Sequence, residues 1–157
     1  MAHEIFLRIE GPAILGESNE TLHRQWIVID SFSISITAAG GEDDSCGACT
    51  HSPMEISKHI DKSSPKLALA ACKRTEFSKV YIDICKPTAG AYDVILKCKL
   101  AGVICVSYSL SGEDQSSDSF SLLYDSIEWH YTALSSYTLA QSGGVMAKWE
   151  VDKNTGY

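Results

Sequence analysis

Hydrophobic and polar residues alternate with a period of two along much of the chain, a pattern that is typical of β-strands with one buried face. The clearest example is residues 31–36, in which Phe32, Ile34 and Ile36 alternate with three serines. A shift of one residue would expose all the apolar side chains of this segment, so the pattern fixes its register. Similar patterns predict about eight strands, at residues 4–9, 26–37, 54–60, 79–85, 92–100, 103–110, 119–131 and 145–151.

Ala101 and Gly102 separate two of these segments and allow two interpretations. A two-residue hairpin turn would require a positive φ at Ala101, which its Cβ disfavours. A glycine inside a strand is common where the strand bends or carries a bulge. We therefore predict one long strand that is bent or bulged at Gly102.

One segment has the features of a helix. Ser63–Pro65 combines an N-cap residue with a proline at the first helical position. Leu67 and Leu69–Ala71 then form an apolar face, and Lys73–Arg74 suits the negative end of the helix dipole. These features predict a short α-helix at about residues 65–74.

The length and composition suit one folded domain. The chain has 157 residues, of which 45% are hydrophobic and 21% are charged, as in soluble globular proteins. Three polar stretches, residues 11–25, 38–52 and 111–118, are predicted loops, and none is long enough to divide domains. We therefore predict a mainly β single domain over residues 1–157, a β-barrel or tight sandwich with one flanking helix.

The charge and hydropathy exclude two classes of partner. The chain has 13 Lys and Arg against 20 Asp and Glu, a net charge of −7, whereas nucleic-acid binding needs a concentrated basic face. No apolar run reaches the roughly 20 residues of a membrane helix, and the N-terminus lacks the pattern of a secretory signal. We expect a protein that is made in the cytoplasm, binds no nucleic acid, does not insert into membranes, and is exported only without a cleaved signal.

The sharpest local motif is Cys46-Gly47-Ala48-Cys49, followed by His51. This spacing is found in zinc sites and in redox-active dithiols. A structural zinc ion needs four ligands, and the sequence has no second motif of this kind; a redox pair is expected at a helix N-terminus, whereas this pair lies in a predicted acidic loop. Three interpretations remain open: a metal site of Cys46, Cys49 and His51, a redox pair, or an incidental exposed or interfacial pair.

No pattern of residues predicts an enzyme or a cofactor. Gly16–Ser18 is not part of a G-x-S-x-G nucleophile motif, because Asn19 and Glu20 follow it. The five histidines are scattered along the chain. A small hydrolase therefore stays only as an alternative function.

Several segments together resemble one family over nearly the whole chain. They are Ala2–Ile9, Gly16–Ser18 with His23, Ile60–Leu67, Ile95–Ser111 and Phe120–Tyr131. In this combination the chain resembles the hemolysin-coregulated proteins, Hcp, which form the tube of bacterial type VI secretion systems. The stretch from Asp61 to Leu67 together with Gly-Glu-Ser and His23 is the specific part of the resemblance.

The resemblance implies a structural protein and not an enzyme. It implies a compact β-barrel with one helix on its flank, assembled as a homo-hexameric ring that stacks into a tube inside a contractile sheath. The tube would leave the cell with the secretion spike and with effectors, some of which are carried inside the ring. The protein would be secreted through this apparatus without a signal peptide.

Two sets of residues are candidates for contacts in such a tube. Ser31, Ser33 and Ser35 form a small, neutral and wettable strand face, which makes them candidates for the lumen. The loops 11–25 and 38–52 are candidates for contacts between stacked rings, the second through Glu42, Asp43, Asp44, Cys46 and Cys49. Because each copy is acidic, stacked rings must place opposite charges locally.

A stand-alone β-barrel that binds a small ligand or peptide is the main alternative to the ring. The Cys46–Cys49 motif departs from the Gly- and Ser-rich loop that the family usually has there. The thiols could lock neighbouring rings after export, or they could have no function.

Overall fold

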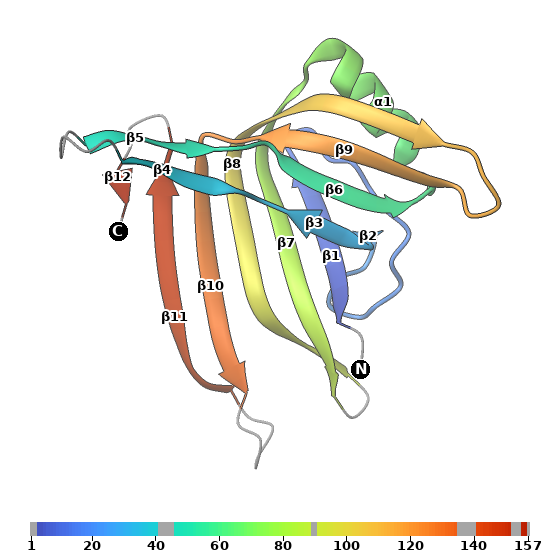
Figure 1. The fold of residues 1–157 in the computed structure, drawn as a ribbon. Coiled ribbons are helices and arrows are strands. Elements are labelled where there is room, and N and C mark those ends of the chain that lie inside the picture. The colour runs from blue at the N-terminus through green and yellow to red at the C-terminus, as the bar shows by residue number, and fades with distance from the viewer. Residues whose placement is uncertain (1–2, 41–45, 89–90, 135–140, 152–154, 157) are drawn as a thin grey trace.

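A computed structural model describes residues 3–40, 46–88, 91–134, 141–151 and 155–156, and its described part is mainly β with one short helix (Figure 1). The elements are β1 (Glu4–Glu10), β2 (Ile27–Ile29), β3 (Ser31–Ser33), β4 (Ile36–Gly40), β5 (Cys46–His51), β6 (Met54–His59), α1 (Ser64–Lys73), β7 (Glu76–Thr88), β8 (Ala91–Ser111), β9 (Ser117–Leu123), β10 (Ser126–Leu134), β11 (Gln141–Glu150) and β12 (Thr155–Gly156). The predicted fold class is confirmed, although the strands outnumber the predicted eight.

The strand pairings follow a closed circuit. β1 pairs with β7, β7 with β8, β8 with β9, β9 with β6 and β6 with β3. Strand β3 follows directly from β2, which pairs again with β1. The circuit forms a barrel, from which β10, β11 and β12 extend the sheet beyond β8. In Figure 1, β3, β6 and β9 form a front layer across the upper part of the long strands β7, β8, β10 and β11, which continue below it.

The barrel core is built from residues that are paired across the strands. Ile9, Val80, Leu100 and Ile127 form one such row on β1, β7, β8 and β10, and all four are buried. The front layer covers this row with Met54, Ile56, Phe120 and Leu122, β2 adds Ile27, and α1 adds Leu67 and Ala70. Burying a side chain of this size contributes roughly 1.5–3 kcal/mol, so the core supplies most of the driving force for the barrel.

Two predicted strands are each divided in the structure. The segment 26–37 contributes three strands with three different partners: β2 pairs with β1, β3 with β6, and β4 with β5. The segment 119–131 is divided at Tyr124–Asp125 into β9 and β10, which belong to different parts of the sheet. Both predictions of a single strand were wrong, because alternation reports which side chains are buried and not which strand lies alongside.

The bend at Gly102 is confirmed. Strand β8 is continuous through Gly102, whose φ is +61°. Up to Ala101 this strand pairs with β10, and from Ile104 it pairs with β9. A Cβ atom at Gly102 would lie 2.3 Å from the Asp125 carboxylate. The glycine therefore lets one strand pass from the long sheet into the front layer.

The helix was predicted within one residue of its observed ends. Pro65 lies in the first turn, and α1 ends before Arg74, which has a positive φ of 51°. Ser63 occupies the N-cap position, but its side chain makes no cap hydrogen bond. It donates instead to the carboxylate of Asp61, which belongs to the network described below.

Candidate functional site

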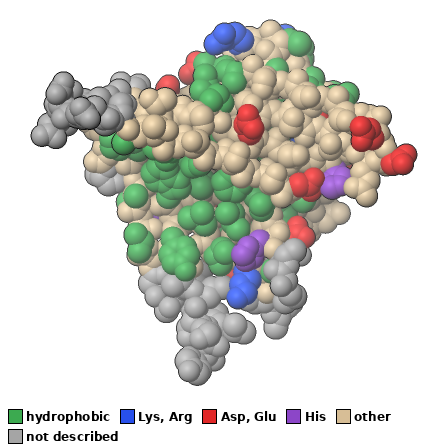
Figure 2. Space-filling view, in the orientation of Figure 1, with side chains coloured by type: hydrophobic (Ala, Val, Ile, Leu, Met, Phe, Trp, Pro, Cys, Tyr) green, Lys and Arg blue, Asp and Glu red, His purple; other side chains and the backbone are tan. Residues whose placement is uncertain are grey.

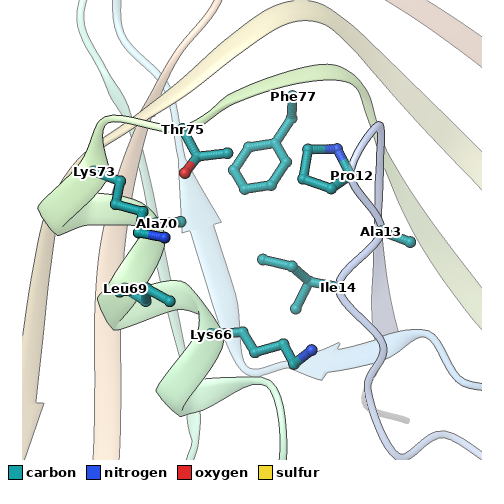
Figure 3. Close-up of a pocket in the computed structure, with 9 residues that line it drawn as sticks. All are labelled: Pro12, Ala13, Ile14, Lys66, Leu69, Ala70, Lys73, Thr75 and Phe77. Carbon is teal, nitrogen blue, oxygen red and sulfur yellow. The ribbon is translucent and has the colours of Figure 1, made fainter.

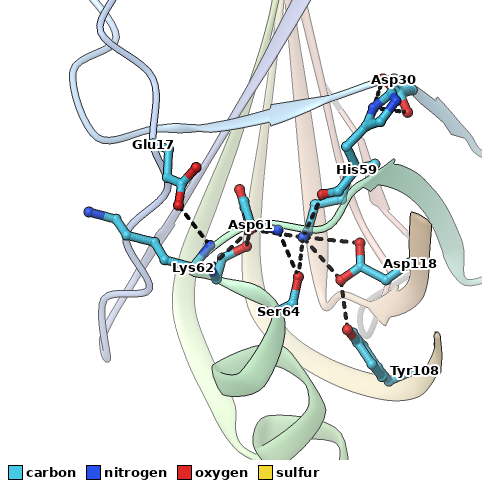
Figure 4. A network of polar contacts seen from close by, with 10 residues as sticks. Glu17, Asp30, His59, Asp61, Lys62, Ser64, Tyr108 and Asp118 are labelled. Carbon is cyan, nitrogen blue, oxygen red and sulfur yellow. Dashed lines mark hydrogen bonds and ion pairs between the residues drawn. The ribbon is translucent and has the colours of Figure 1, made fainter. Parts of the chain in front are cut away.

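A buried network surrounds Lys58 at the start of the helix, and Figure 4 shows its members Asp61, Ser64, Tyr108 and Asp118. The Lys58 side chain is fully buried, and its Nζ lies 3.0 Å from Asp61 Oδ1, 2.9 Å from Ser64 Oγ and 3.0 Å from both carboxylate oxygens of Asp118. The hydroxyl of Tyr108 donates to Asp118 at 2.6 Å. Burial and the neighbouring Asp118 raise the pKa of Tyr108 to about 12, so the phenol remains a donor. The network joins β6, α1, β8 and β9.

This network is structural, although it contains a Ser–Lys pair of the kind some hydrolases use. A lysine that activates a serine must have a lone pair to accept the hydroxyl proton. Here the three N–H groups of the Lys58 ammonium are shared among four acceptors, including the His59 carbonyl at 3.3 Å, and the side chain has no contact with solvent. Such a group can neither take a proton from Ser64 nor meet a substrate.

A second buried cluster holds the segment 11–25 against the barrel. The His23 ring is 2% exposed and stacks on Phe6 at 4.4 Å between centroids. Its Nδ1 contacts the Glu20 carboxylate, and its Nε2 lies 2.8 Å from Asp83 Oδ2 on β7. The Asp83 contact links the segment to β7 and the stacking on Phe6 links it to β1, while the Glu20 contact lies within the segment itself.

The Gly-Glu-Ser motif has a structural explanation in the same segment. Gly16 lies so close to the next part of the chain that a Cβ atom there would be 2.4 Å from the Trp26 carbonyl oxygen. Glu17 accepts a hydrogen bond from the backbone of Lys62 at 3.2 Å, and the Ser18 hydroxyl accepts one from the backbone of Glu20. The residues on which the family resemblance rests therefore shape the loop and the start of the helix.

Sequence reasoning did not find Lys58, Tyr108, Asp118, Glu20 or Asp83. For Lys58 a signal was present. It follows Met54 and Ile56 at the same period of two, and both of these are buried. Alternation therefore placed this lysine in the core, where a charge needs partners. Asp83 lies 60 residues from His23 and Asp118 lies 60 residues from Lys58, so no local pattern indicated these contacts. Glu20 lies three residues before His23, but nothing in the sequence showed that the two side chains meet.

The predicted lumen serines belong to a larger polar surface. In the register of the front layer Ser31 lies opposite Ser57, which lies opposite Ser119, which lies opposite Ser109. The next row is Ser33, Glu55, Ser121 and Ser107. We call these eight residues the serine face; Ser31 and Ser33 are exposed in it, and Ser35 is exposed just beyond β3. Its side chains are small, and all of them are neutral except that of Glu55.

The Cys46–Cys49 motif lies on a strand and not in a loop, so this part of the prediction was wrong. Strand β5 begins at Cys46 and includes Cys49, and it pairs with β4. Glu42, Asp43 and Asp44 lie outside the described residues, as does the side chain of Cys46. The thiol of Cys49 is half-buried. The roles of these residues in stacking, redox chemistry or metal binding remain predictions.

His51, the third residue of that motif, has a partner within the chain. Its Nδ1 lies 2.7 Å from the Tyr124 hydroxyl, and burial lowers the pKa of the imidazole. Burial raises the pKa of Tyr124 to about 12, so the phenol donates to the neutral ring. Within the described ranges no cluster of three or more His, Cys, Asp or Glu residues could hold a metal ion.

The long sheet has an apolar face that the front layer does not cover. Its lowest row is Ile5, Ile84, Leu96, Tyr131 and Val145, paired in this order across β1, β7, β8, β10 and β11. Ile5, Ile84 and Leu96 are half-buried, whereas Tyr131 is 50% and Val145 is 70% exposed. With Trp129 and Ala147 of the next row they form what we call the open apolar face. Figure 2 shows hydrophobic side chains gathered there, below the front layer.

The opposite face of the same sheet is polar. One row there consists of Arg8, Tyr81, Lys99, Glu128 and Lys148. At the upper end of the open apolar face a cavity of about 350 Å³ lies between the β4–β5 hairpin and β10–β11, lined by Ile36, Cys49, His51, Trp129, Ala147, Lys148, Trp149 and Gly156. Large exposed apolar surfaces rimmed by polar residues mark interaction sites. This face is therefore the best candidate for a functional surface.

Comparisons with known proteins agree with this picture. A family model described as "Type VI secretion system effector, Hcp" matches residues 6–131. A type six secretion system protein of known structure has a TM-score of 0.89 at 22% identity, over 99% of this chain and 100% of its own. The structure of Hcp1 from Salmonella typhimurium has a TM-score of 0.82 at 22% identity, over 100% of both chains. The structure of the secreted protein Hcp3 from Pseudomonas aeruginosa has a TM-score of 0.74 at 17% identity, over 95% of this chain and 98% of its own. No curated protein matches the chain.

The described residues include no helix that could span a membrane, since α1 has only 10 residues. The family match covers most of the chain, and the structural matches extend the same fold to nearly all of it.

Proposed function

Because this chain belongs to the Hcp family of type VI secretion systems, we propose that it is a subunit of a hexameric ring of the secretion tube and carries effectors in the ring lumen. A role as a tube component follows from family membership, and this family is not known for enzymes. The closed ring, its stacking in the sheath behind a spike, and the lumen that carries effectors form the proposal.

The open apolar face is the observation that best supports the proposed ring. A ring of identical subunits joins two different surfaces of each protomer, head to tail. The open apolar face would be one of these surfaces. The exposed part of its Tyr131 and Val145 has no covering layer within the described chain. Covering such a surface with a second copy removes apolar area from water, at about 25 cal/mol per Å² before the costs of association.

A second, different surface, with two exposed apolar side chains among acidic ones, is available at the other end of the sheet. The strand order runs from β12 and β11 at one end to β1 and β2 at the other. Near β2 the exposed side chains of Val28 and Ile60 line a depression of about 200 Å³, together with Glu17, Asp30, His59 and Asp61. We propose that this surface receives the open apolar face of the neighbouring subunit.

The serine face supports the proposed lumen. Small hydroxyl side chains keep a bore wide and wet, and they offer no strong apolar or charged contact that would retain a cargo. A serine-rich layer with one carboxylate per protomer suits transient binding of diverse effectors better than the open apolar face would.

Substitutions by glutamate at two adjacent residues of β11 test the proposed ring. Val145→Glu places a carboxylate on the open apolar face, whereas Met146→Glu places one on the opposite face of the same strand, where Met146 is 58% exposed. Sedimentation velocity should show six copies for the unmodified chain and for Met146→Glu, but smaller species for Val145→Glu. A monomer for the unmodified chain at high concentration contradicts the ring and favours the stand-alone binding module, for which the 350 Å³ cavity would be the site.

A further inference from the structure

A groove lies between helix α1 and residues 12–14, and it shares no residue with the open apolar face or the serine face (Figure 3). It has a volume of about 230 Å³. Ile14, Ala70 and Phe77 are buried residues that contribute to its lining. Pro12 and Ala13 line the loop side. The groove is therefore apolar along its base and open at the surface.

The helix side of the groove is a regular stripe. Lys66, Leu69, Ala70 and Lys73 line it, and their spacing of i, i+3, i+4 and i+7 places them on one face of α1. Leu69 is 52% exposed, and each lysine is exposed about one turn away from it. The inward position Leu67 already packs against the barrel, so the exposed leucine is not needed for the fold.

The charge of this groove is opposite to that of the chain. Its nine lining residues include two lysines and no carboxylate, whereas the whole chain has 20 acidic residues against 13 basic ones. Glu76 stands between two lining residues, Thr75 and Phe77. Alternation along the chain directs its side chain to the other face. The groove therefore offers an apolar base between two cations.

We propose that this groove binds an amphipathic acidic helix of a partner protein. An apolar side chain of that helix would contact Leu69, Ile14 and Phe77, and carboxylates about one turn on either side would pair with the two lysines. Lys66 and Lys73 are seven residues apart, about 10 Å along the helix at roughly 1.5 Å per residue, which matches two carboxylates seven residues apart on a facing helix. Amphipathic helices commonly bind such grooves. The inference does not depend on the ring.

A charge-swap experiment with two synthetic peptides tests this proposal. The first is a 15-residue helical peptide with a central leucine and a glutamate at the third position before and the fourth after it; in its twin both glutamates are lysines. Fluorescence anisotropy with the full chain in its assembled state should show binding of the acidic peptide only. Lys66→Glu with Lys73→Glu should weaken that binding at least tenfold and create binding of the lysine peptide. Leu69→Ala should weaken it severalfold.

The matched control changes the same charge elsewhere. Lys79 and Lys86 are exposed on β7 and do not line the groove, so Lys79→Glu with Lys86→Glu should leave binding unchanged. Binding that survives the groove variant, or a lysine peptide that fails to bind it, overturns the proposal. So does a smaller assembly of the groove variant in sedimentation, because the groove would then contact another copy. Binding of the groove to phosphatidylserine vesicles without binding of the acidic peptide also overturns it, in favour of a lipid surface.

Discussion

The Lys58 network and the open apolar face depart from the usual distribution of polar and apolar groups in opposite ways. At Lys58 a charged side chain is fully buried, and its partners all belong to this chain. At the open apolar face a row of apolar side chains crosses five strands, and Tyr131 and Val145 at its β10–β11 end are at least half exposed. The first arrangement is complete within one chain, whereas the second would be completed by the neighbouring subunit of the proposed ring.

The difference separates what stabilises the fold from what serves assembly. A buried charge that lost its partners would strongly destabilise the barrel, so selection for folding alone can maintain the network. Exposed apolar side chains contribute little to the fold and risk aggregation. Their position on one face of the sheet, with charged residues on the other face, fits the contact between subunits that we propose. The comparison therefore predicts that mutations in the two regions affect different measurements.

The largest expected effect is on stability, from Lys58→Met. The substitution keeps most of the side-chain volume but leaves Asp61 and Asp118 buried without their cation, which typically costs about 3–5 kcal/mol of unfolding free energy. Urea unfolding of the isolated protomer measures the loss. Lys62→Met, an exposed control four residues later, should change stability by less than about 0.5 kcal/mol. Equal effects of the two substitutions would mean that the network is not the structural centre we describe.

The next effect is on assembly, from Tyr131→Ala. Removing a half-exposed aromatic side chain should change the unfolding free energy of the protomer by less than about 1 kcal/mol. The same change should weaken ring association by about 2 kcal/mol, the scale of an interface hot spot. Concentration-dependent light scattering measures the association. Leu110→Ala, at an exposed leucine near the end of β8, is the control. If Leu110→Ala weakened ring association and Tyr131→Ala did not, the interface would lie elsewhere than on the open apolar face.

The contrast between the two regions also shows what the sequence could predict. Alternation gave the β class and most strand positions, and the serine–proline start gave the helix, because both features are local. The bend at Gly102 could be predicted because a hairpin turn would have required a positive φ at Ala101, whereas a glycine inside a strand favours a bend. In the structure it is Gly102 that has the positive φ. The division of residues 26–37 into three strands could not be, because pairing partners are set by distant parts of the chain.

The candidate sites were less accessible to sequence reasoning for the same reason. The serines at 31, 33 and 35 were recognisable, but their extension across β6, β9 and β8 depends on register. The open apolar face consists of side chains from five strands that each look like ordinary core residues in sequence. Only the positions of the front layer and the hairpin show that this part of the sheet is uncovered.

A smaller effect concerns pH at the upper end of the open apolar face. Burial lowers the pKa of His51, so folding favours its neutral form. This contribution to stability is fully present above the unfolded pKa of about 6.5, and it is lost as the pH falls through the lower folded pKa. Unfolding free energies of the unmodified chain and of His51→Gln, measured between pH 5 and pH 8, should differ in slope only at the acidic end.

Ring formation should strengthen this dependence, because a neighbouring subunit on the open apolar face would bury His51 further. The same pH series on rings and on Val145→Glu protomers tests this. Identical pH slopes of the unfolding free energy for rings and for Val145→Glu protomers would mean that His51 lies outside the interface. The contact surface would then be smaller than the open apolar face and its cavity together.

The smallest structural effect and the most specific functional one are expected at the serine face. Ser33→Arg adds a long cation to an exposed position of β3, so stability should change by less than about 0.5 kcal/mol and the ring should remain intact. If the serine face lines the lumen, six such cations narrow the bore, and co-purification of effector with the ring should fall. Met146→Arg, which adds the same charge at an exposed position on the opposite face of the long sheet, is the control for charge. Unchanged effector binding by Ser33→Arg would place the serine face outside the lumen, while the open apolar face could still close the ring.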